Sequence, residues 1–176
     1  MATTDTGFTP KGNLRGSTTG IKRDFIIGDT KTITVGDMVR LADGFIDLAA
    51  AGNPILGCVV GFRDANGLDL SNSRADYDGT WTESTKTYVS AGDNSTDHQI
   101  RAIVEIDPFT IYSGQPDDAI ATHHLAGEYG DLVAASDQVD ADTVTSSQAQ
   151  MFYLGLDPEN TARGLYVIAE HQIWGA

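Results

Sequence analysis

The sequence predicts an all-β protein, an antiparallel β-barrel or β-sandwich of about ten short strands preceded by a flexible N-terminal arm. Lys and Glu, which commonly cover the surfaces of helices, are scarce. Val, Ile and Thr are abundant and fall in short runs, either alternating or wholly apolar, which is typical of strands. Gly and Asp separate these runs at spacings of roughly 8–15 residues, and no long amphipathic helical pattern occurs.

Length and charge narrow the function classes. A chain of 176 residues predicts one domain, or one domain with an arm. The formal net charge of −14 disfavours a nucleic-acid partner, because a phosphate backbone repels such a surface. The charge is uneven, since residues 1–23 carry four basic side chains and one acidic side chain. A mildly basic start therefore precedes a strongly acidic body.

The first twenty residues are rich in Gly, Thr and Ser and poor in apolar groups. Such a segment does not order itself alone, so we expect residues 1–20 to form a flexible arm and residues 21–176 a single β-rich domain. The arm either stays free or becomes ordered against a neighbour. In the second case its basic and apolar side chains make the contacts with that neighbour: Phe8, Lys11, Leu14, Arg15, Lys22 and Arg23.

No secretory signal and no membrane helix are predicted. The N-terminus lacks an apolar core, and no stretch approaches the roughly 20 apolar residues of a membrane span. Cys58 is the single cysteine, so the fold does not depend on an internal disulfide. We expect a soluble protein, made in the cytoplasm, with no membrane partner.

The first half of the body predicts strands separated by turns. Gly36-Asp37 interrupts an alternating run like a tight bend, and Asp43-Gly44 is a hairpin signal. The run at 55–62 is short, β-branched and almost wholly apolar, which predicts a buried strand with Cys58 as a small core residue. The predicted strands are residues 21–27, 31–41, 45–48 and 55–62.

The second half contains a long excursion at about 64–97, which begins with many turn formers and predicts a surface loop or β-hairpin. Tyr77 and Trp81 are its candidate contact residues. Residues 119–125 predict a strand or a single helical turn. The remaining predicted strands are residues 86–91, 98–106, 109–112, 129–134, 149–156 and 164–173.

Catalytic and metal-binding motifs are missing from the sequence, so we expect no enzyme, no cofactor and no metal site. His123 and His124 are adjacent, and on a strand they would face opposite sides. The acidic loops that begin at Asp64 and Asp93 place oxygen ligands close together, as calcium requires. The same residue types form turns without any ion, which we favour.

Four stretches together resemble the small β-domains of tailed-phage capsid decoration (cement) proteins. These stretches are TVGDMVRL at 34–41, GFIDLAAAG at 44–52, ILGCVVG at 55–61 and RAIVEIDPFTI at 101–111. The resemblance covers residues 30–62 and 98–174, and the chain departs from it at 64–97, where it is longer.

The resemblance implies a virion structural protein, made in the host cytoplasm, that binds the outer surface of a phage capsid and stabilises the shell. Its expected partners are the major capsid protein and further copies of itself, as a homotrimer. The alternative is a carbohydrate-binding or host-attachment module on a virion or cell surface, which would use exposed aromatic side chains. The candidates for that use are Tyr77, Trp81, Tyr88 and Trp174.

Overall fold

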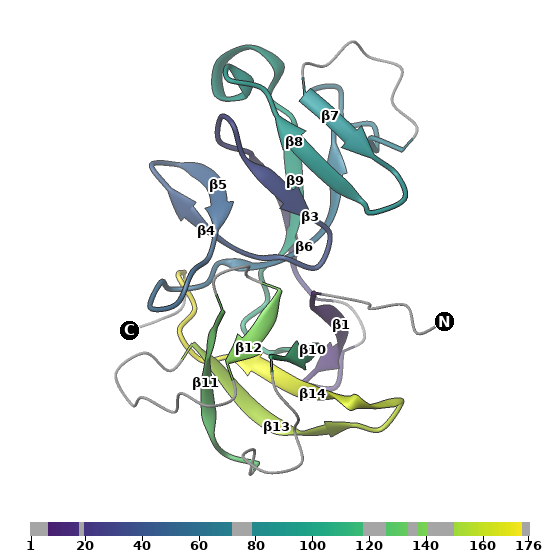
Figure 1. Ribbon diagram of the computed structural model, residues 1–176, viewed down its shortest axis with the longest axis vertical. Helices are drawn as coiled ribbons and strands as arrows, with labels where there is room; N and C mark the ends of the chain where they lie inside the picture. The colour runs from purple at the N-terminus through teal and green to yellow at the C-terminus, as the bar shows by residue number, and fades with distance from the viewer. Residues whose placement is uncertain are drawn as a thin grey trace.

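The computed structural model describes residues 7–17, 20–71, 79–117, 126–133, 137–140 and 150–173. These residues form fourteen strands and one short π-helix, which confirms the all-β class. The strands are arranged in two lobes along the long axis (Figure 1). The elements are β1 (Thr9–Asn13), β2 (Lys22–Ile26), β3 (Thr32–Thr34), β4 (Met38–Ala42), β5 (Phe45–Leu48), β6 (Gly57–Arg63), β7 (Gly79–Thr82), β8 (Thr87–Ser90), η1 (Asn94–His98), β9 (Arg101–Glu105), β10 (Thr110–Pro116), β11 (Tyr129–Leu132), β12 (Gln138–Asp140), β13 (Met151–Asp157) and β14 (Asn160–Ile168).

The N-terminal lobe contains a five-stranded sheet in the order β2-β9-β6-β4-β5 and a three-stranded sheet in the order β3-β8-β7. The predicted hairpin turn is confirmed, because Asp43 and Gly44 connect β4 to β5 and Ala42 pairs with Phe45. Their φ angles of 51° and 90° are both positive, as a two-residue type I′ turn requires. The predicted bend at Gly36-Asp37 separates β3 from β4.

Most of the described part of the excursion belongs to the body of this lobe. The β7–β8 hairpin pairs with β3, and Tyr88 on β8 is fully buried. Trp81 on β7 packs edge-on against Phe62, with 5.5 Å between ring centroids. Of the two predicted outcomes, a surface loop or a β-hairpin, residues 79–90 form the hairpin. Tyr77 lies outside the described residues.

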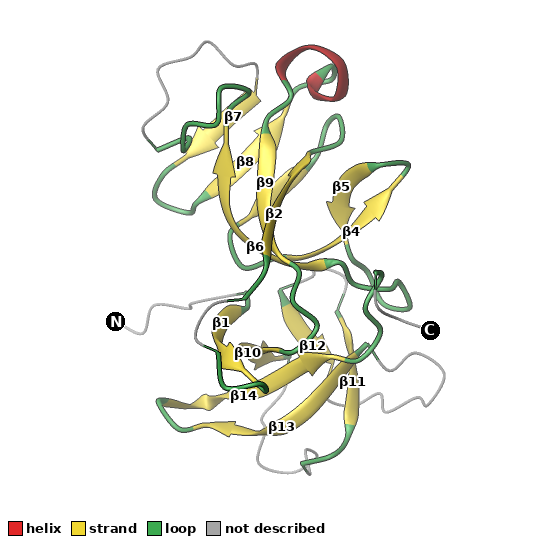
Figure 2. Ribbon diagram, turned by 180° about the vertical axis from the view of Figure 1, so that it is seen from behind, coloured by secondary structure: helices red, strands yellow, loops and turns green. Residues whose placement is uncertain are grey.

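The C-terminal lobe is a small barrel (Figure 2). Its sheet runs β1-β10-β12-β11-β13-β14, and β10 also pairs with β14, so the sheet closes on itself. Tyr112 faces Tyr166 across this closure. The strand pairs are antiparallel as expected except for β10 and β12, which are parallel, and two isolated parallel bridges join Ile27 to Ile46 and Ile55 to His171. The predicted segment 119–125 lies outside the described residues.

Two hydrophobic clusters share the strands β4 and β6. Met38 and Cys58 point into the C-terminal cluster, whereas their neighbours Val39 and Val59 point into the N-terminal cluster. Successive side chains of a strand face opposite sides, so these strands are buried on both faces. This double burial explains why the run at 55–62 is almost continuously apolar.

The prediction of a flexible arm is wrong for the part of residues 1–20 that the structure describes. Residues 9–13 form β1, which pairs with β10, and Phe8 is only 2% exposed within the C-terminal cluster. The Phe8 N–H donates to the Gly36 carbonyl at 2.8 Å, which ties the segment to both lobes. The composition of the arm did not indicate this outcome, because a single aromatic residue, Phe8, anchors a segment otherwise rich in Gly, Thr and Ser.

Candidate interaction surface

The outer side of the C-terminal barrel carries apolar side chains at positions where a free-standing barrel would expose polar ones. On β13, Met151 and Tyr153 point into the core, whereas Phe152, Leu154 and Leu156 remain partly or largely exposed. Tyr129 on β11 pairs with Phe152, and their rings lie in edge contact at 5.1 Å. A register shift between Tyr153 and Gly155 interrupts the alternation of β13, so we define the apolar face by exposure and not by strand side, as Tyr129, Phe152, Leu154 and Leu156.

The exposed fractions of these side chains indicate whether the apolar face is available for contact. Leu156 is 47% exposed and Tyr129 is 42% exposed. An antiparallel sheet with one face in water normally alternates apolar inward and polar outward residues. Tyr129 and Phe152 are in direct contact, and exposed apolar side chains that adjoin one another on a soluble protein favour a contact surface. The apolar face is therefore the best-supported candidate for contact with a macromolecule.

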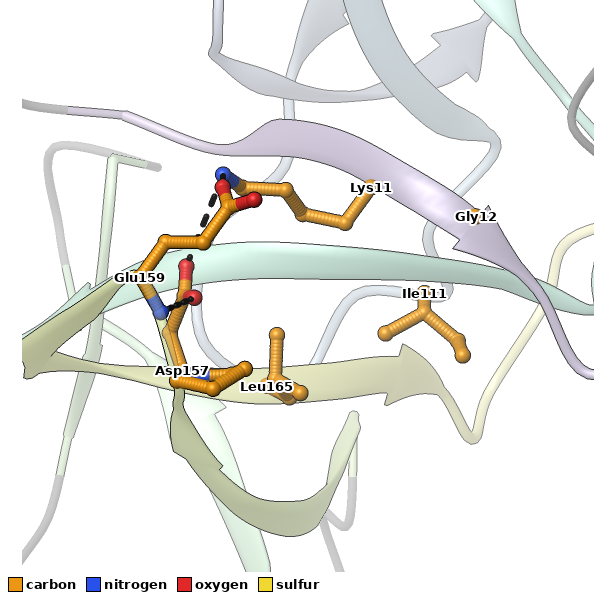
Figure 3. A pocket seen from close by; sticks show the side chains of 7 residues that line it. Lys11, Gly12, Ile111, Asp157, Glu159 and Leu165 are labelled. Carbon is orange, nitrogen blue, oxygen red and sulfur yellow. Dashed lines mark hydrogen bonds and ion pairs between the residues drawn. The ribbon is translucent and has the colours of Figure 1, made fainter.

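A pocket of about 240 Å³ lies on the same barrel, between β1 and the β13–β14 turn (Figure 3). Ile111 and Leu165 provide apolar lining, and Lys11 projects from β1 towards the turn. The carboxylates of Asp157 and Glu159 lie near the Lys11 ammonium. The full lining is Lys11, Gly12, Ile111, Asp157, Pro158, Glu159 and Leu165.

The electrostatics of the pocket favour positive charge. Lys11 Nζ lies 2.5 Å from Glu159 Oε2 and 3.8 Å from Asp157 Oδ2, so two carboxylates share one ammonium. The hydrogen bond to Glu159 raises the pKa of Lys11. Burial alone would raise the pKa of Asp157, but hydrogen bonds from Ser113 and the Glu159 backbone, with the charge of Lys11, hold it below its usual range. Both members of the Lys11–Asp157 pair are thus charged at neutral pH.

The predicted contact residues of the arm divide into two groups. Phe8 and Lys11 are already engaged within the chain, in the core and in the ion pairs of the pocket. Leu14 is 54% exposed, and Arg15 lies 3.6 Å above the Phe109 ring. Lys22 and Arg23 are exposed at the start of β2, an edge strand, and the adjacent Ile21 is 42% exposed.

Two backbone hydrogen bonds bring the exposed residues of this segment onto one stretch of chain. The Leu14 N–H donates to the Phe109 carbonyl at 2.9 Å, and the Ile106 N–H donates to the Ile21 carbonyl at 2.7 Å. Both ends of the linker between β1 and β2 therefore lie along residues 106–109. The N-terminal patch is defined as Leu14, Arg15, Ile21, Lys22 and Arg23.

The loop that begins at Asp64 has a structural explanation without calcium. Asp64 Oδ1 accepts hydrogen bonds from the Asn66 and Leu68 backbone N–H groups, both at 2.9 Å, as in an Asx turn. Among the described residues, no group of three or more His, Cys, Asp or Glu side chains is placed to hold a metal ion. His123 and His124 lie outside the described residues.

The loop at Asp93 leads into η1. The Asp93 carbonyl accepts a hydrogen bond from the Thr96 N–H at 3.0 Å, which is a local turn contact. Cys58 is buried, and burial raises the pKa of its thiol far above the usual range, so the thiolate is disfavoured. Neither feature provides a reactive group.

Comparison of the chain with protein-family models, with curated proteins and with solved structures found no match. Within the described part of the chain, no helix has the length and apolar character that a membrane span requires. We therefore infer the function from the apolar face, the N-terminal patch and the pocket.

Sequence reasoning missed both the apolar face and the pocket. The pattern at 149–156 predicts a strand, yet its partly or largely exposed residues Phe152, Leu154 and Leu156 are also apolar. That pattern was a readable signal for a strand covered on both sides. The pocket left no such signal, because it joins β1 to a turn about 145 residues later in the chain, a separation that local periodicity does not register.

Proposed function

We propose that this chain is a virion structural protein that binds the outer surface of a tailed-phage capsid and stabilises the shell. The observation that carries the proposal is the apolar face on the C-terminal barrel, together with the resemblance to decoration proteins. A protein that stabilises a lattice needs contact surfaces and shape, and it needs no reactive centre.

The resemblance gains support from where its stretches lie in the fold. The segments at 34–41, 44–52, 55–61 and 101–111 contribute to β4, β5, β6 and β9, which are adjacent strands of one sheet. Stretches that are scattered along the sequence thus form a contiguous structural unit. Its outward side carries charged pairs, for example Lys31 with Asp47 at 2.9 Å. This charged exterior favours the N-terminal lobe as the part that faces solvent.

The apolar face is the surface that we assign to the shell. Apolar area buried on binding contributes about 25 cal/mol per Å², so even a few partly exposed large side chains strengthen a lattice contact. Repetition around a symmetric assembly multiplies the effect, since several weak contacts act together. The N-terminal patch provides a second, separate contact surface.

The carbohydrate-binding alternative has less support from the predicted aromatic residues. Tyr88 is fully buried in the core. Trp81 packs against Phe62, and its Nε1–H donates to Glu83 at 2.9 Å. Tyr77 and Trp174 lie outside the described residues. A glycan array tests this alternative directly, and selective binding that competes with shell binding would favour it.

The experiment is co-sedimentation with capsids assembled from the major capsid protein of the same genome. The wild-type chain is expected to bind expanded capsids saturably and unexpanded proheads weakly or not at all. Leu156→Ser should weaken binding at least about tenfold, through loss of buried apolar area. Leu68→Ser is the matched control, because Leu68 is 54% exposed but lies in a loop of the N-terminal lobe. Equal binding by both variants would reject the apolar face as the shell contact.

A further inference from the structure

The pocket on the C-terminal barrel is too small for a cofactor. Its volume of about 240 Å³ lies below the roughly 300–1,000 Å³ typical of small-molecule sites, so it suits one large side chain. Ile111 and Leu165 line it with apolar surface, and the carboxylates of Asp157 and Glu159 lie at one end. A long cationic side chain matches this pattern, because its aliphatic stem packs on apolar surface while its charged head meets the carboxylates.

The pocket also contains a carboxylate oxygen that lacks a hydrogen-bond donor. Asp157 is only 1% exposed, and its Oδ2 accepts no hydrogen bond from the described residues. The Lys11 ammonium lies 3.8 Å from that oxygen, beyond hydrogen-bonding distance, and donates instead to Glu159. A buried carboxylate oxygen without a donor is costly, so a second cation entering the pocket would satisfy it.

The same chain provides suitable cations. Lys22 and Arg23 are exposed in the N-terminal patch, and no carboxylate of the described residues lies within 4.0 Å of either cation. The charge of Lys22 acts only at longer range on Glu105, its partner across β2 and β9. Arg15 already lies over Phe109. Several other cations are occupied by acidic partners of their own lobe: Lys31, Arg40, Arg63 and Lys86.

Charge complementarity extends beyond the pocket. Residues 107–176 contain eleven acidic side chains and one basic side chain, Arg163. The N-terminal patch contains three basic side chains, Arg15, Lys22 and Arg23, and no acidic side chain. The N-terminal patch of one copy and the C-terminal barrel of another therefore attract each other, whereas two C-terminal barrels repel.

We propose that the pocket of one copy receives Lys22 or Arg23 from the N-terminal patch of a second copy of this chain. The contact is head to tail, because it joins two different surfaces, and repetition around an axis closes a ring. Leu14 and Ile21 of the patch contribute apolar area beside the cations. The inference deepens the proposed function and rests on it for the role of the assembly, but the contact itself requires no capsid.

The test is sedimentation velocity of the full chain at low salt, without capsids. The wild type is expected to associate, and the association should weaken as salt is added. The double variant Lys22→Glu/Arg23→Glu should weaken it at least about tenfold, because it places like charges at the contact. Lys31→Glu/Lys86→Glu is the matched control, with the same change in net charge at exposed or partly exposed sites outside the N-terminal patch, and should associate like wild type.

A charge swap identifies the partner surface. Glu159→Lys should also weaken association by itself, and an equimolar mixture with Lys22→Glu/Arg23→Glu should restore it. A wild-type chain that stays monomeric at all concentrations would overturn the proposal, as would undiminished association of the double variant. If that variant lost capsid binding while associating normally, the patch would contact the shell instead. Circular dichroism and melting curves verify that each variant is folded.

Discussion

The two lobes differ in the polarity of the side chains on the outward side of their sheets. In the N-terminal lobe, Val39 and Leu48 pair on the core side, and Arg40 and Asp47 pair on the outside. In the C-terminal barrel, β13 carries apolar residues on both sides. The first pattern is typical of a sheet that faces water, and the second favours the proposed contact of the barrel with another macromolecule.

The lobes also differ in which segments of the chain contribute residues to their hydrophobic clusters. The N-terminal cluster draws its residues from strands of its own lobe and from the segments that connect them. The C-terminal cluster includes Phe8 from the segment before β1, and Met38, Ile55 and Cys58 from the junction with the N-terminal lobe. The C-terminal barrel thus depends on residues from distant parts of the sequence. This dependence makes it the more sensitive lobe to changes at the junction.

The largest expected effect comes from Phe8→Ala. Phe8 is 2% exposed and in edge contact with Tyr166, so its loss should destabilise the C-terminal barrel by about 3–5 kcal/mol. Hydrogen exchange should show lost protection in β10, β13 and β14, with β6 and β9 retained. Phe62→Ala is the reciprocal variant, since Phe62 is 1% exposed in the N-terminal cluster. Uniform loss of protection in both variants would show that the lobes unfold as one unit.

The next effect concerns Asp37 at the junction. Burial raises its pKa to about 7, and the nearby charge of Asp137 adds to the shift. Between about pH 4 and pH 7 the native state retains a proton that the unfolded chain releases, so stability falls as pH rises across this window. Asp37→Asn should therefore stabilise the protein at pH 8 by at most about 4 kcal/mol, and have little effect near pH 4.

Melting curves of wild type and Asp37→Asn between pH 4 and pH 8 measure this difference. Burial also raises the pKa of Glu105 and of Asp131, so some pH dependence should persist in the variant. An asparagine oxygen can still accept the hydrogen bond that the Thr34 N–H donates to Asp37 Oδ2 at 2.7 Å. An equal stability gain at pH 4 and pH 8 would rule out titration of Asp37 as the cause.

The smallest effect is expected at the charged exterior of the N-terminal lobe. Asp47 lies 2.9 Å from Lys31 Nζ and 3.6 Å from an Arg40 nitrogen, and these partners help to hold its pKa below the usual range against burial. Asp47→Asn should cost at most about 1 kcal/mol at pH 7, because surface ion pairs are weak. Denaturant unfolding at pH 7 and pH 3 measures the loss, which should shrink as Asp47 becomes protonated. A loss of several kcal/mol would mean that this exterior is buried in an assembly.

Local patterns predicted much of the fold. The dipeptide Asp43-Gly44 strongly favours a two-residue hairpin turn, and the continuous apolar run at 55–62 favours a buried strand. Both features could therefore be identified from neighbouring residues. Phe8 and the pocket could not, because each depends on contacts between segments distant in the sequence. The outward apolar residues of β13 were visible, but their meaning depends on which side the core occupies. The sequence therefore predicted most of the strands, but not β1 or β12, and the structure revealed which surfaces remain available.

An electron cryo-microscopy map of capsids decorated with the purified chain tests the central claim most directly. We expect density on the outer shell in which β11 and β13 face the capsid and β4 and β5 face solvent. We also expect that the start of β2 in one copy lies at the pocket of its neighbour. Bare capsids, or density with the N-terminal lobe against the shell and the apolar face in solvent, would contradict this claim.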